Sequence, residues 1–412
     1  MTVKKRRSSN PSPKDTSAAE EQHEMSGPPE SKLKKMVIRV IAALVMVSFA
    51  AGVILFGRHL GAGAMVSFLT ICIFNELVNV AHTEANANLE IPWFRTVPWL
   101  WFLVASHLAY SQDGLSYAPM NLSGALERNV PYIGSELGQG LIFLKNHSGL
   151  LSLWVYSITF VVSVLALRKK HLTTQLHILS FTVLALSLFV IPMKMAIHNA
   201  FAGLFWFIFP VILVAVNDSF AYFCGFFLKH QIFGEREFLS ISPNKTWEGF
   251  VGGGIFTVLA GFFLPLLLNH KFLTCSYDAI EAVGGNVSAC VPNEELFGNE
   301  GYDSGNFKIL NIQYHGIILA LFASTVAPFG GFLASAIKRV YGLKDFANFI
   351  PGHGGFMDRL DCQFLMALAT FVHLRTFVLV NEDMNFTKVL RSAIALSPEG
   401  REKLCRELSS FP

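Results

Sequence analysis

The segment from Ser335 to Asp361 holds the residues whose types and spacing most clearly suggest a chemistry. It overlaps the end of the uncharged run 316–337 and combines four cations and three carboxylates with a glycine-rich turn. Fixed cations and closely approaching backbone amides suit a polyphosphate, and carboxylates suit the magnesium ion that accompanies it. The alternative is a hydrated loop of a membrane protein whose positive charge only fixes orientation. The cations are Lys338, Arg339, Lys344 and Arg359, the carboxylates are Asp345, Asp358 and Asp361, and the turn is Gly352-His353-Gly354-Gly355.

The spacing of the carboxylates suggests how such an ion would be held. Asp358 and Asp361 are three residues apart, so on a helix both would lie on one face and could share a divalent ion. Alternatively, Asp358 pairs with Arg359 or caps the start of that helix. Asp345 follows Lys344, so it either supplies a third ligand or orients that lysine.

A further carboxylate, Asp218, interrupts the otherwise uncharged run 203–228. A charged side chain at membrane depth costs about 2.5–3.5 kcal/mol on insertion scales, so it is normally functional or paired. The sequence therefore predicts a catalytic or metal-linked role for Asp218, with a structural ion pair as the alternative. Ser242, Lys245 and Thr246 follow this run and can offer backbone and side-chain donors to a nucleotide.

The glycine turn is expected to lie against the phosphates. Gly352, Gly354 and Gly355 allow the backbone a close approach, and Arg359 adds a fixed charge beside them. His353 either contacts phosphate or serves only as a structural donor within the turn.

These residues carry a resemblance to a known family. Segment 335–361 is similar to the signature of the phosphatidate cytidylyltransferases, or CDP-diacylglycerol synthases: S-x-aliphatic-K-R, four residues, K-D, then P-x-H-G-G-x-x-D-R-x-D. Every fixed position is met, and segment 217–249 resembles the upstream D-x-x-A-Y-x-x-G and S-P-x-K-T-W-E-G elements. The chain departs from many bacterial members, which carry an aspartate in a G-D-L-like triplet. It reads Gly330-Gly331-Phe332 there, as eukaryotic members do, and Asp218 is a candidate for the missing charge.

The resemblance implies a eukaryotic-type membrane nucleotidyltransferase that converts CTP and phosphatidic acid to CDP-diacylglycerol and pyrophosphate with Mg²⁺. It also implies a homodimer. The implied catalytic residues are Asp218, Lys338, Arg339, Lys344, Asp345, Asp358 and Asp361. The implied nucleotide-binding residues are Ser242, Lys245, Thr246, His353, Gly354, Gly355 and Arg359, and the implied metal ligands are Asp218, Asp358 and Asp361.

Two other functions remain as alternatives. A CTP-dependent polyprenol or lipid kinase would use similar groups but would transfer the γ-phosphate and release CDP. A transporter would also combine apolar spans with charge inside the membrane, but transporters tend to show paired halves, and this sequence shows no internal repeat. Nucleic acid is not expected as a partner, because the cations do not form a long stripe interleaved with aromatic residues.

The composition indicates the fold class. Hydrophobic residues make up 52% of the chain and charged residues 15%, where a soluble domain is about a quarter charged. Several uncharged runs are long enough to cross a hydrocarbon core of roughly 30 Å, so we expect an all-α, polytopic membrane bundle with about nine spans. The third run is short and the last contains two basic residues, and the sequence does not decide which of them crosses completely. The expected spans are 37–57, 60–80, 97–112, 150–167, 176–193, 203–228, 249–269, 316–337 and 363–380.

Three regions are expected along the chain. Residues 1–35 are polar and predict a disordered cytoplasmic tail, residues 36–380 form the membrane-embedded catalytic domain, and residues 381–412 form a C-terminal tail. Counting spans from a cytoplasmic N-terminus places both motif segments in the cytoplasm, in keeping with the positive-inside rule.

The long connections fall on the opposite side in that count. They contain glycosylation-type triplets at Asn121, Asn146 and Asn286. Cys275 and Cys290 share one of these connections and could form a disulfide in an oxidising lumen. We therefore expect a multi-pass protein of the endoplasmic reticulum membrane whose active site faces the cytoplasm.

Overall fold

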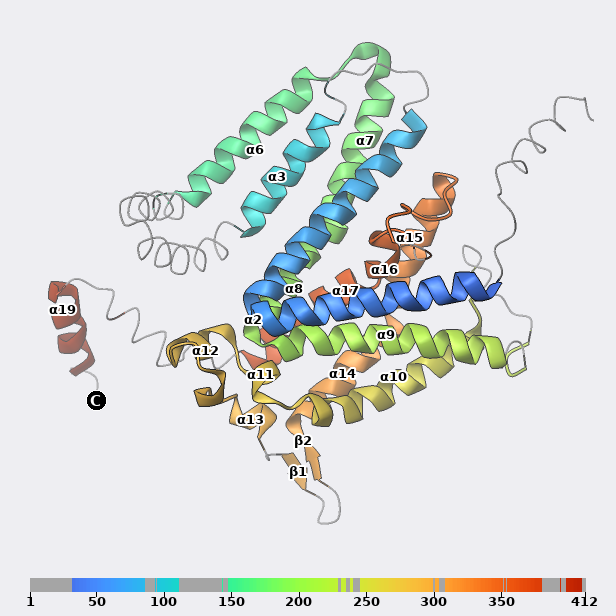
Figure 1. Cartoon of the computed structure of the whole chain (residues 1–412). Coiled ribbons are helices and arrows are strands. Elements are labelled where there is room, and N and C mark those ends of the chain that lie inside the picture. Colours follow the sequence, from blue (N-terminus) through green and yellow to red (C-terminus); the bar gives the residue numbers. More distant parts are fainter. Residues whose placement is uncertain are drawn as a thin grey trace, which may run out of the picture.

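The computed structural model of this chain shows a bundle of long apolar helices (Figure 1). In its described part, six helical stretches are long and apolar enough to cross a membrane, which confirms the all-α, polytopic prediction. These stretches are Val37–His82, Ser148–Leu165, Lys169–Ala202, Leu204–Phe227, Trp247–Leu268 and Asn311–Val340. The described residues are 32–85, 93, 95–110, 143, 147–228, 231–234, 238–239, 245–298, 301–303, 308–350, 352, 354–379, 393 and 398–409.

The first expected pair of spans forms one sharply kinked element, α2 (Lys32–Ala85). The kink is at Arg58, whose φ of 48° is rare for a residue with a side chain and persists only where the surroundings hold it. The Arg58 guanidinium donates to the carbonyl oxygen of Gly285, and Nε2 of the buried His59 lies 3.2 Å from that of Cys275. In Figure 1 the two arms of α2 diverge from this point. The kink is therefore held by the connection 270–298.

The remaining spans lie at the expected positions, although the stretch Lys169–Ala202 extends beyond both ends of the predicted span 176–193. The two arms of α2, five further long stretches and two shorter helices correspond to the nine runs predicted from the sequence. Both shorter helices have apolar stretches below the length that crosses a bilayer unaided. The elements after α2 are α3 (Thr96–Tyr110), α6 (Ser148–Leu165), α7 (Leu172–Ala185), the π-helix η2 (Leu186–Val190), α8 (Ile191–Ala202), α9 (Leu204–Phe227), α10 (Trp247–Leu268), α14 (Asn311–Thr325), α15 (Pro328–Val340), α17 (Gln363–His373) and the π-helix η4 (Leu374–Val378).

The expected span 316–337 lies within one membrane-spanning stretch, Asn311–Val340, and this stretch consists of two helices. Helix α14 ends at Thr325 and α15 begins at Pro328, with a turn between them. Proline has no amide hydrogen and favours the first position of a new helix, so it ends one segment and starts the next. The start of α15 packs directly on the chain at Asp361, because a Cβ atom on Gly330 would overlap the Asp361 carbonyl oxygen.

Helices α9 and α10 approach each other closely through glycine. A Cβ atom on Gly249 would lie 2.6 Å from the carbonyl oxygen of Ala221, and one on Gly253 would lie 3.0 Å from that of Asn217. The Thr257 hydroxyl donates to the Asn217 side-chain oxygen across this contact. Small residues let membrane helices pack backbone to backbone, so the position next to Asn217, which is Asp218, is rigidly placed.

The hydrophobic core joins α9 to α14 and α17. Buried Phe205 and Phe209 of α9 pack with Ile312 of α14 and Met366 of α17 in one cluster. The shorter elements are η1 (Lys169–His171), α11 (Lys271–Thr274), α12 (Tyr277–Ala282), η3 (Val287–Ala289), α13 (Glu294–Phe297), the antiparallel strands β1 (Gly301–Asp303) and β2 (Lys308–Leu310), α16 (Met357–Leu360) and α19 (Pro398–Ser409).

The domain boundaries stay a prediction. Helix α2 begins at Lys32, inside the expected tail 1–35, while residues 1–31 and 380–392 lie outside the described residues, as do Asn121 and Asn146.

The two cysteines that share the 270–298 connection form a disulfide, Cys275–Cys290. Both are buried, and they pack with Ile280 in a small cluster of their own. The bond therefore closes the loop whose carbonyl groups contact the kink of α2.

Replacing both cysteines, Cys275→Ser with Cys290→Ser, is expected to lower the free energy of unfolding by about 3 kcal/mol. A disulfide that closes a loop of roughly this length contributes that much by restricting the unfolded chain. The denaturation midpoint in detergent, without reductant, measures the effect. Cys405→Ser removes an exposed free cysteine and is the control. A double variant as stable as the unmodified chain would contradict the expectation.

Candidate active site

A buried ion pair between Lys338 and Asp358 lies at the centre of the signature segment. Lys338 Nζ is 2.7 Å from Asp358 Oδ1, and the exposed fractions of the two side chains are 17% and 3%. Lys338 belongs to the last turn of α15 and Asp358 to the short helix α16. A carboxylate this buried needs a charged partner, so the pair fixes α16 against α15.

The second oxygen of Asp358 is also engaged. Asp358 Oδ2 accepts hydrogen bonds from the backbone amides of Phe346, at 2.9 Å, and Gly355, at 3.0 Å. One carboxylate therefore joins the end of α15, the following loop and the glycine turn. This matches the alternative in which Asp358 has a structural role, although its partners are Lys338 and two amides.

The glycine turn adopts a conformation that side chains disfavour. Gly352 and Gly354 have φ of 73° and 81°, and the Ile350 amide donates to the Gly354 carbonyl oxygen across the turn. A Cβ atom on Gly354 would also lie 2.9 Å from Asp358 Oδ2. Glycine at this position is thus required both by the backbone and by the approach of Asp358.

A residue that the sequence analysis missed, Glu76, contacts the same turn. Its oxygens Oε1 and Oε2 accept from the backbone amides of Phe356 and Met357, each at 2.8 Å. Glu76 belongs to the second arm of α2 and is 4% exposed. The signal was present, because Glu76 is a lone acidic residue within the expected span 60–80, as Asp218 is within its own run.

Asp361 forms a second cluster with Asp218. Burial raises the pKa of the Asp361 carboxyl to about 6; the Cys362 thiol, which hydrogen-bonds to this carboxyl, acts against burial, and the charge of Asp218 adds to it. Asp218 in turn interacts electrostatically with Lys245 and Arg359. The first and second motif segments are thus brought together, as the sequence analysis required.

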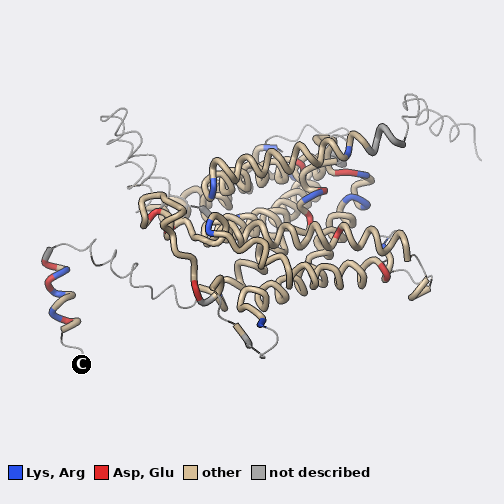
Figure 2. Tube along the Cα trace, turned by 60° about the horizontal axis from the view of Figure 1, so that its bottom comes forward, with Lys and Arg blue, Asp and Glu red and all other residues tan. Residues whose placement is uncertain are grey.

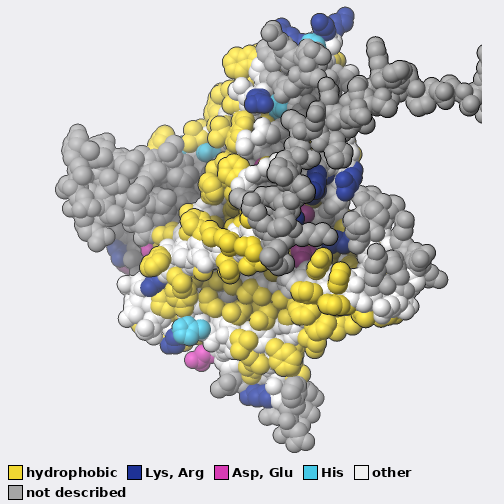
Figure 3. Space-filling model, turned by 45° about the vertical axis from the view of Figure 1, so that its right-hand side comes forward, with side chains coloured by type: hydrophobic (Ala, Val, Ile, Leu, Met, Phe, Trp, Pro, Cys, Tyr) yellow, Lys and Arg dark blue, Asp and Glu magenta, His cyan; other side chains and the backbone are white. Residues whose placement is uncertain are grey.

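Gly331, which stands where many bacterial members carry an aspartate, lies beside this cluster. A Cβ atom on Gly331 would lie 3.3 Å from Asp361 Oδ2. Figure 2 shows several red and blue segments together at one side of the helical body, and in Figure 3 dark blue and magenta side chains lie side by side on a largely yellow face. The charge of Asp218 acts on Asp361, and its role as a replacement for the carboxylate that Gly331 lacks stays a prediction.

The other predicted site residues lie around these two clusters. Arg339, Lys344 and Arg359 are exposed, and Asp345 is half-buried, with its Cβ and Cγ atoms 3.3 Å from a Cβ placed on Gly354. The Thr246 hydroxyl accepts from the Gly249 amide and caps α10, which is a structural use of a residue predicted to bind nucleotide. The nucleotide-binding role predicted for exposed Lys245 stays a prediction, and Ser242 and His353 lie outside the described residues.

The carboxylates offer a partial set of ligands for a metal ion. Among the described residues, no group of three histidine, cysteine or acidic side chains is arranged to hold one. Magnesium is usually bound by one or two carboxylates together with substrate phosphates, so Asp218 and Asp361 fit its chemistry. The oxygens of Asp358 are engaged by Lys338 and two amides, and its assignment as a ligand stays a prediction.

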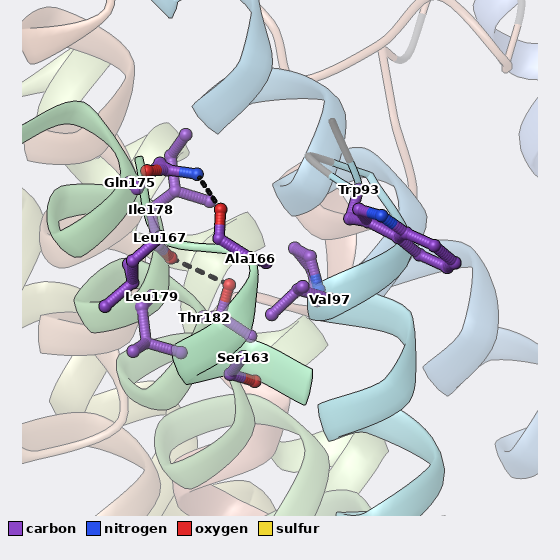
Figure 4. Close-up of a pocket in the computed structure, with 10 residues that line it drawn as sticks. Trp93, Val97, Ser163, Ala166, Leu167, Gln175, Ile178, Leu179 and Thr182 are labelled. Carbon is purple, nitrogen blue, oxygen red and sulfur yellow. Dashed lines mark hydrogen bonds between the residues drawn. The ribbon is translucent and has the colours of Figure 1, made fainter. Parts of the chain in front are cut away.

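A separate pocket lies away from the predicted site residues. Figure 4 shows it between α3, the end of α6 and α7, with Trp93, Val97, Ser163, Gln175 and Thr182 among its lining side chains. Gln175 Nε2 donates to the Ala166 carbonyl oxygen within it. None of the predicted catalytic or nucleotide-binding residues lines this pocket, so it is not the candidate active site.

Comparisons with known proteins decide the family. The model of the cytidylyltransferase family matches residues 135–377, which include both motif segments. This chain belongs to the cytidylyltransferase family. Phosphatidate cytidylyltransferase 1 of Mus musculus is 33% identical over 389 residues, covering 92% of this chain and 79% of the relative. Phosphatidate cytidylyltransferase 2 of Homo sapiens is 31% identical over 395 residues (92% and 82%), and the probable phosphatidate cytidylyltransferase of Dictyostelium discoideum is 34% identical over 401 residues (92% and 78%).

Asp358 lies within α16 and Asp361 lies at its C-terminal end. The stability of the protein should respond differently when each charge is removed. Asp358→Asn removes the charge that pairs with Lys338 and turns one of the two acceptor oxygens into a donor that faces another donor, so the free energy of unfolding is expected to fall by about 3 kcal/mol. Asp361→Asn removes a charge that burial disfavours, so stability should be unchanged or higher. Thermal unfolding in one detergent compares the two variants. Equal losses of stability would contradict the assignment of Asp358 as the structural centre of the site.

Proposed function

We propose that this member of the cytidylyltransferase family is a phosphatidate cytidylyltransferase, which converts CTP and phosphatidic acid to CDP-diacylglycerol and pyrophosphate. The proposal is supported by the family match and by relatives of that name that cover most of the chain. The observation that carries it is the meeting of the two motif segments. Asp218 of the first segment interacts electrostatically with Arg359 and Asp361 of the second.

The grouped charges answer the main obstacle to this reaction, which is that both substrates are anions. An oxygen of the phosphatidate phosphate attacks the α-phosphorus of CTP, and pyrophosphate leaves. Fixed cations offset the repulsion between the substrates, and Lys338, Arg339, Lys344 and Arg359 are the residues proposed for that role. The phosphate monoester is already ionised near neutral pH, since its second pKa is about 6, so a strong general base is not required.

Each carboxylate has a distinct part in this scheme. Asp358 orients Lys338 and holds the glycine turn, through contacts described above. Asp218 and Asp361 are proposed to hold Mg²⁺, with Asp345 beside the glycine turn as a further polar group. Bound there, magnesium would supply positive charge that offsets the negative charge of the triphosphate.

The arrangement of α2 supports a defined orientation. Arg58 at the kink contacts the disulfide-bonded connection, and Arg39 at the start of the first arm contacts the glycine turn, so these two features lie at opposite ends of one crossing. The cations around the turn favour the cytoplasm by the positive-inside rule. The endoplasmic reticulum membrane and a homodimer are the location and assembly that we propose.

Product analysis tests the proposed reaction. Purified protein in detergent is expected to release pyrophosphate from CTP when both Mg²⁺ and phosphatidic acid are present, and not with either one omitted. Asp361→Asn should lower this rate at least a hundredfold while the protein stays folded. Diacylglycerol or a polyprenol in place of phosphatidic acid is the control acceptor. Release of CDP instead of pyrophosphate would identify a lipid kinase and overturn the proposal.

The affinity for Mg²⁺ should depend on the protonation of Asp361. Because its pKa is raised to about 6, the carboxylate is charged at pH 7.5 and becomes protonated as the pH falls through 6. A ligand must be deprotonated to bind a metal, so the affinity should weaken about tenfold per pH unit below 6. The rise in unfolding temperature caused by Mg²⁺ alone, without nucleotide or lipid, measures this. In Asp361→Asn the pH dependence should vanish; the same dependence in that variant would remove Asp361 from the proposed site.

A further inference from the structure

We propose that Glu76 is a positioning residue for the transfer reaction: its carboxylate fixes the backbone from which Asp358 and Asp361 project. The inference rests on the proposed function and concerns a residue outside both motif segments. Glu76 lies in the second arm of α2 and accepts from the amides of Phe356 and Met357, which are 280 and 281 residues further along the chain.

Carboxylates hold three successive amides at this point of the chain. The Gly355 amide donates to Asp358, and those of Phe356 and Met357 donate to Glu76. Amides at the start of a helix have no partners within it, and a carboxylate there makes short, charge-assisted bonds. Glu76 and Asp358 together therefore determine the path of the backbone into α16.

The Glu76 carboxylate lies so close to Gly355 that no larger residue fits at that position. A Cβ atom on Gly355 would lie 2.6 Å from one oxygen of Glu76 and 2.7 Å from the other. The glycine at this position is thus explained by Glu76 as well as by any approach to phosphate. A shift of the Glu76 carboxylate would move α16 and, with it, Asp361.

The other arm of α2 contacts the opposite end of the same turn. A Cβ atom on Gly352 would lie 3.0 Å from Cγ of Arg39 and 3.8 Å from Cγ2 of Ile38. The turn is therefore held between the two arms, and the angle between them is set by the kink at Arg58. Through its hydrogen bonds to the amides of Phe356 and Met357, Glu76 couples the position of the second arm to the position of Asp358 and Asp361.

A positioning role has a signature that a purely structural role lacks. Residues that orient the ligands of a metal typically change metal affinity or activity about 10–100-fold when they are replaced. Glu76→Gln keeps the size of the side chain but turns one of its two acceptors into a donor that faces an amide. It is therefore expected to raise the apparent KM for Mg²⁺ about tenfold or more at equal folded fraction.

The matched control is Gln313→Ala. Gln313 is equally buried, accepts from the Leu310 amide and donates to the Phe262 carbonyl oxygen, but it lies at the start of α14. Its loss should lower the unfolding temperature without changing the apparent KM for Mg²⁺ or CTP. Glu76→Asp, which keeps the charge but is too short to reach both amides, replaces Glu76→Gln if that variant does not fold.

Two measurements on each protein separate the possible outcomes: steady-state release of pyrophosphate, and the rise in unfolding temperature caused by Mg²⁺ with CTP. A raised KM and a smaller thermal shift in the Glu76 variants, but not in Gln313→Ala, support the inference. Unchanged values in folded Glu76 variants overturn it. If the unmodified protein shows the thermal shift but no pyrophosphate release, the proposed function fails while the shift still tests Glu76. If it shows neither, both proposals fail.

Discussion

The site depends on the compensation of one buried charge. Asp358 is nearly inaccessible to solvent, and its two oxygens satisfy a lysine and two backbone amides. In surroundings of low dielectric, an unpaired carboxylate would be costly, and each of these partners would also lose its acceptor. The loop after α15, the glycine turn and α16 therefore take up their positions as a unit, because all three meet at the same carboxylate.

The need to bring partners to the buried Asp358 explains the break between α14 and α15, and the glycines of α10 serve the neighbouring Asp218. The break between α14 and α15 lets α15 pack closely on Asp361 and bring Lys338 to Asp358. The glycines of α10 let α9 approach it, which places Asp218 opposite the signature segment. Non-helical backbone at membrane depth is tolerated where protein surrounds it, and here it occurs next to the charged cluster.

Much of this architecture was readable from the sequence, because membrane spans and phosphate-binding residues both leave local signals. The uncharged runs located the membrane helices, although the stretch Lys169–Ala202 extends well beyond the run predicted for it, and the motifs named candidate site residues whose roles stay predictions. Contacts between distant segments were not readable. Nothing local pairs Glu76 with Phe356 or separates the two roles open to Asp358, since both depend on partners brought by folding. We expected one span over 316–337, and the turn within it, before Pro328 at the start of α15, was not predicted.

The long separation between Glu76 and its partners has a consequence for biosynthesis. The second arm of α2 enters the membrane early, whereas Phe356 and Met357 are translated about 280 residues later. At about 5–20 residues per second, roughly 15–55 s pass before those amides exist. During that interval the carboxyl group must stay protonated, remain at the water interface or be shielded by the insertion machinery. Until residues 356 and 357 have been made, Glu76 is thus an acidic side chain inside an apolar helix with neither of these amides to bind.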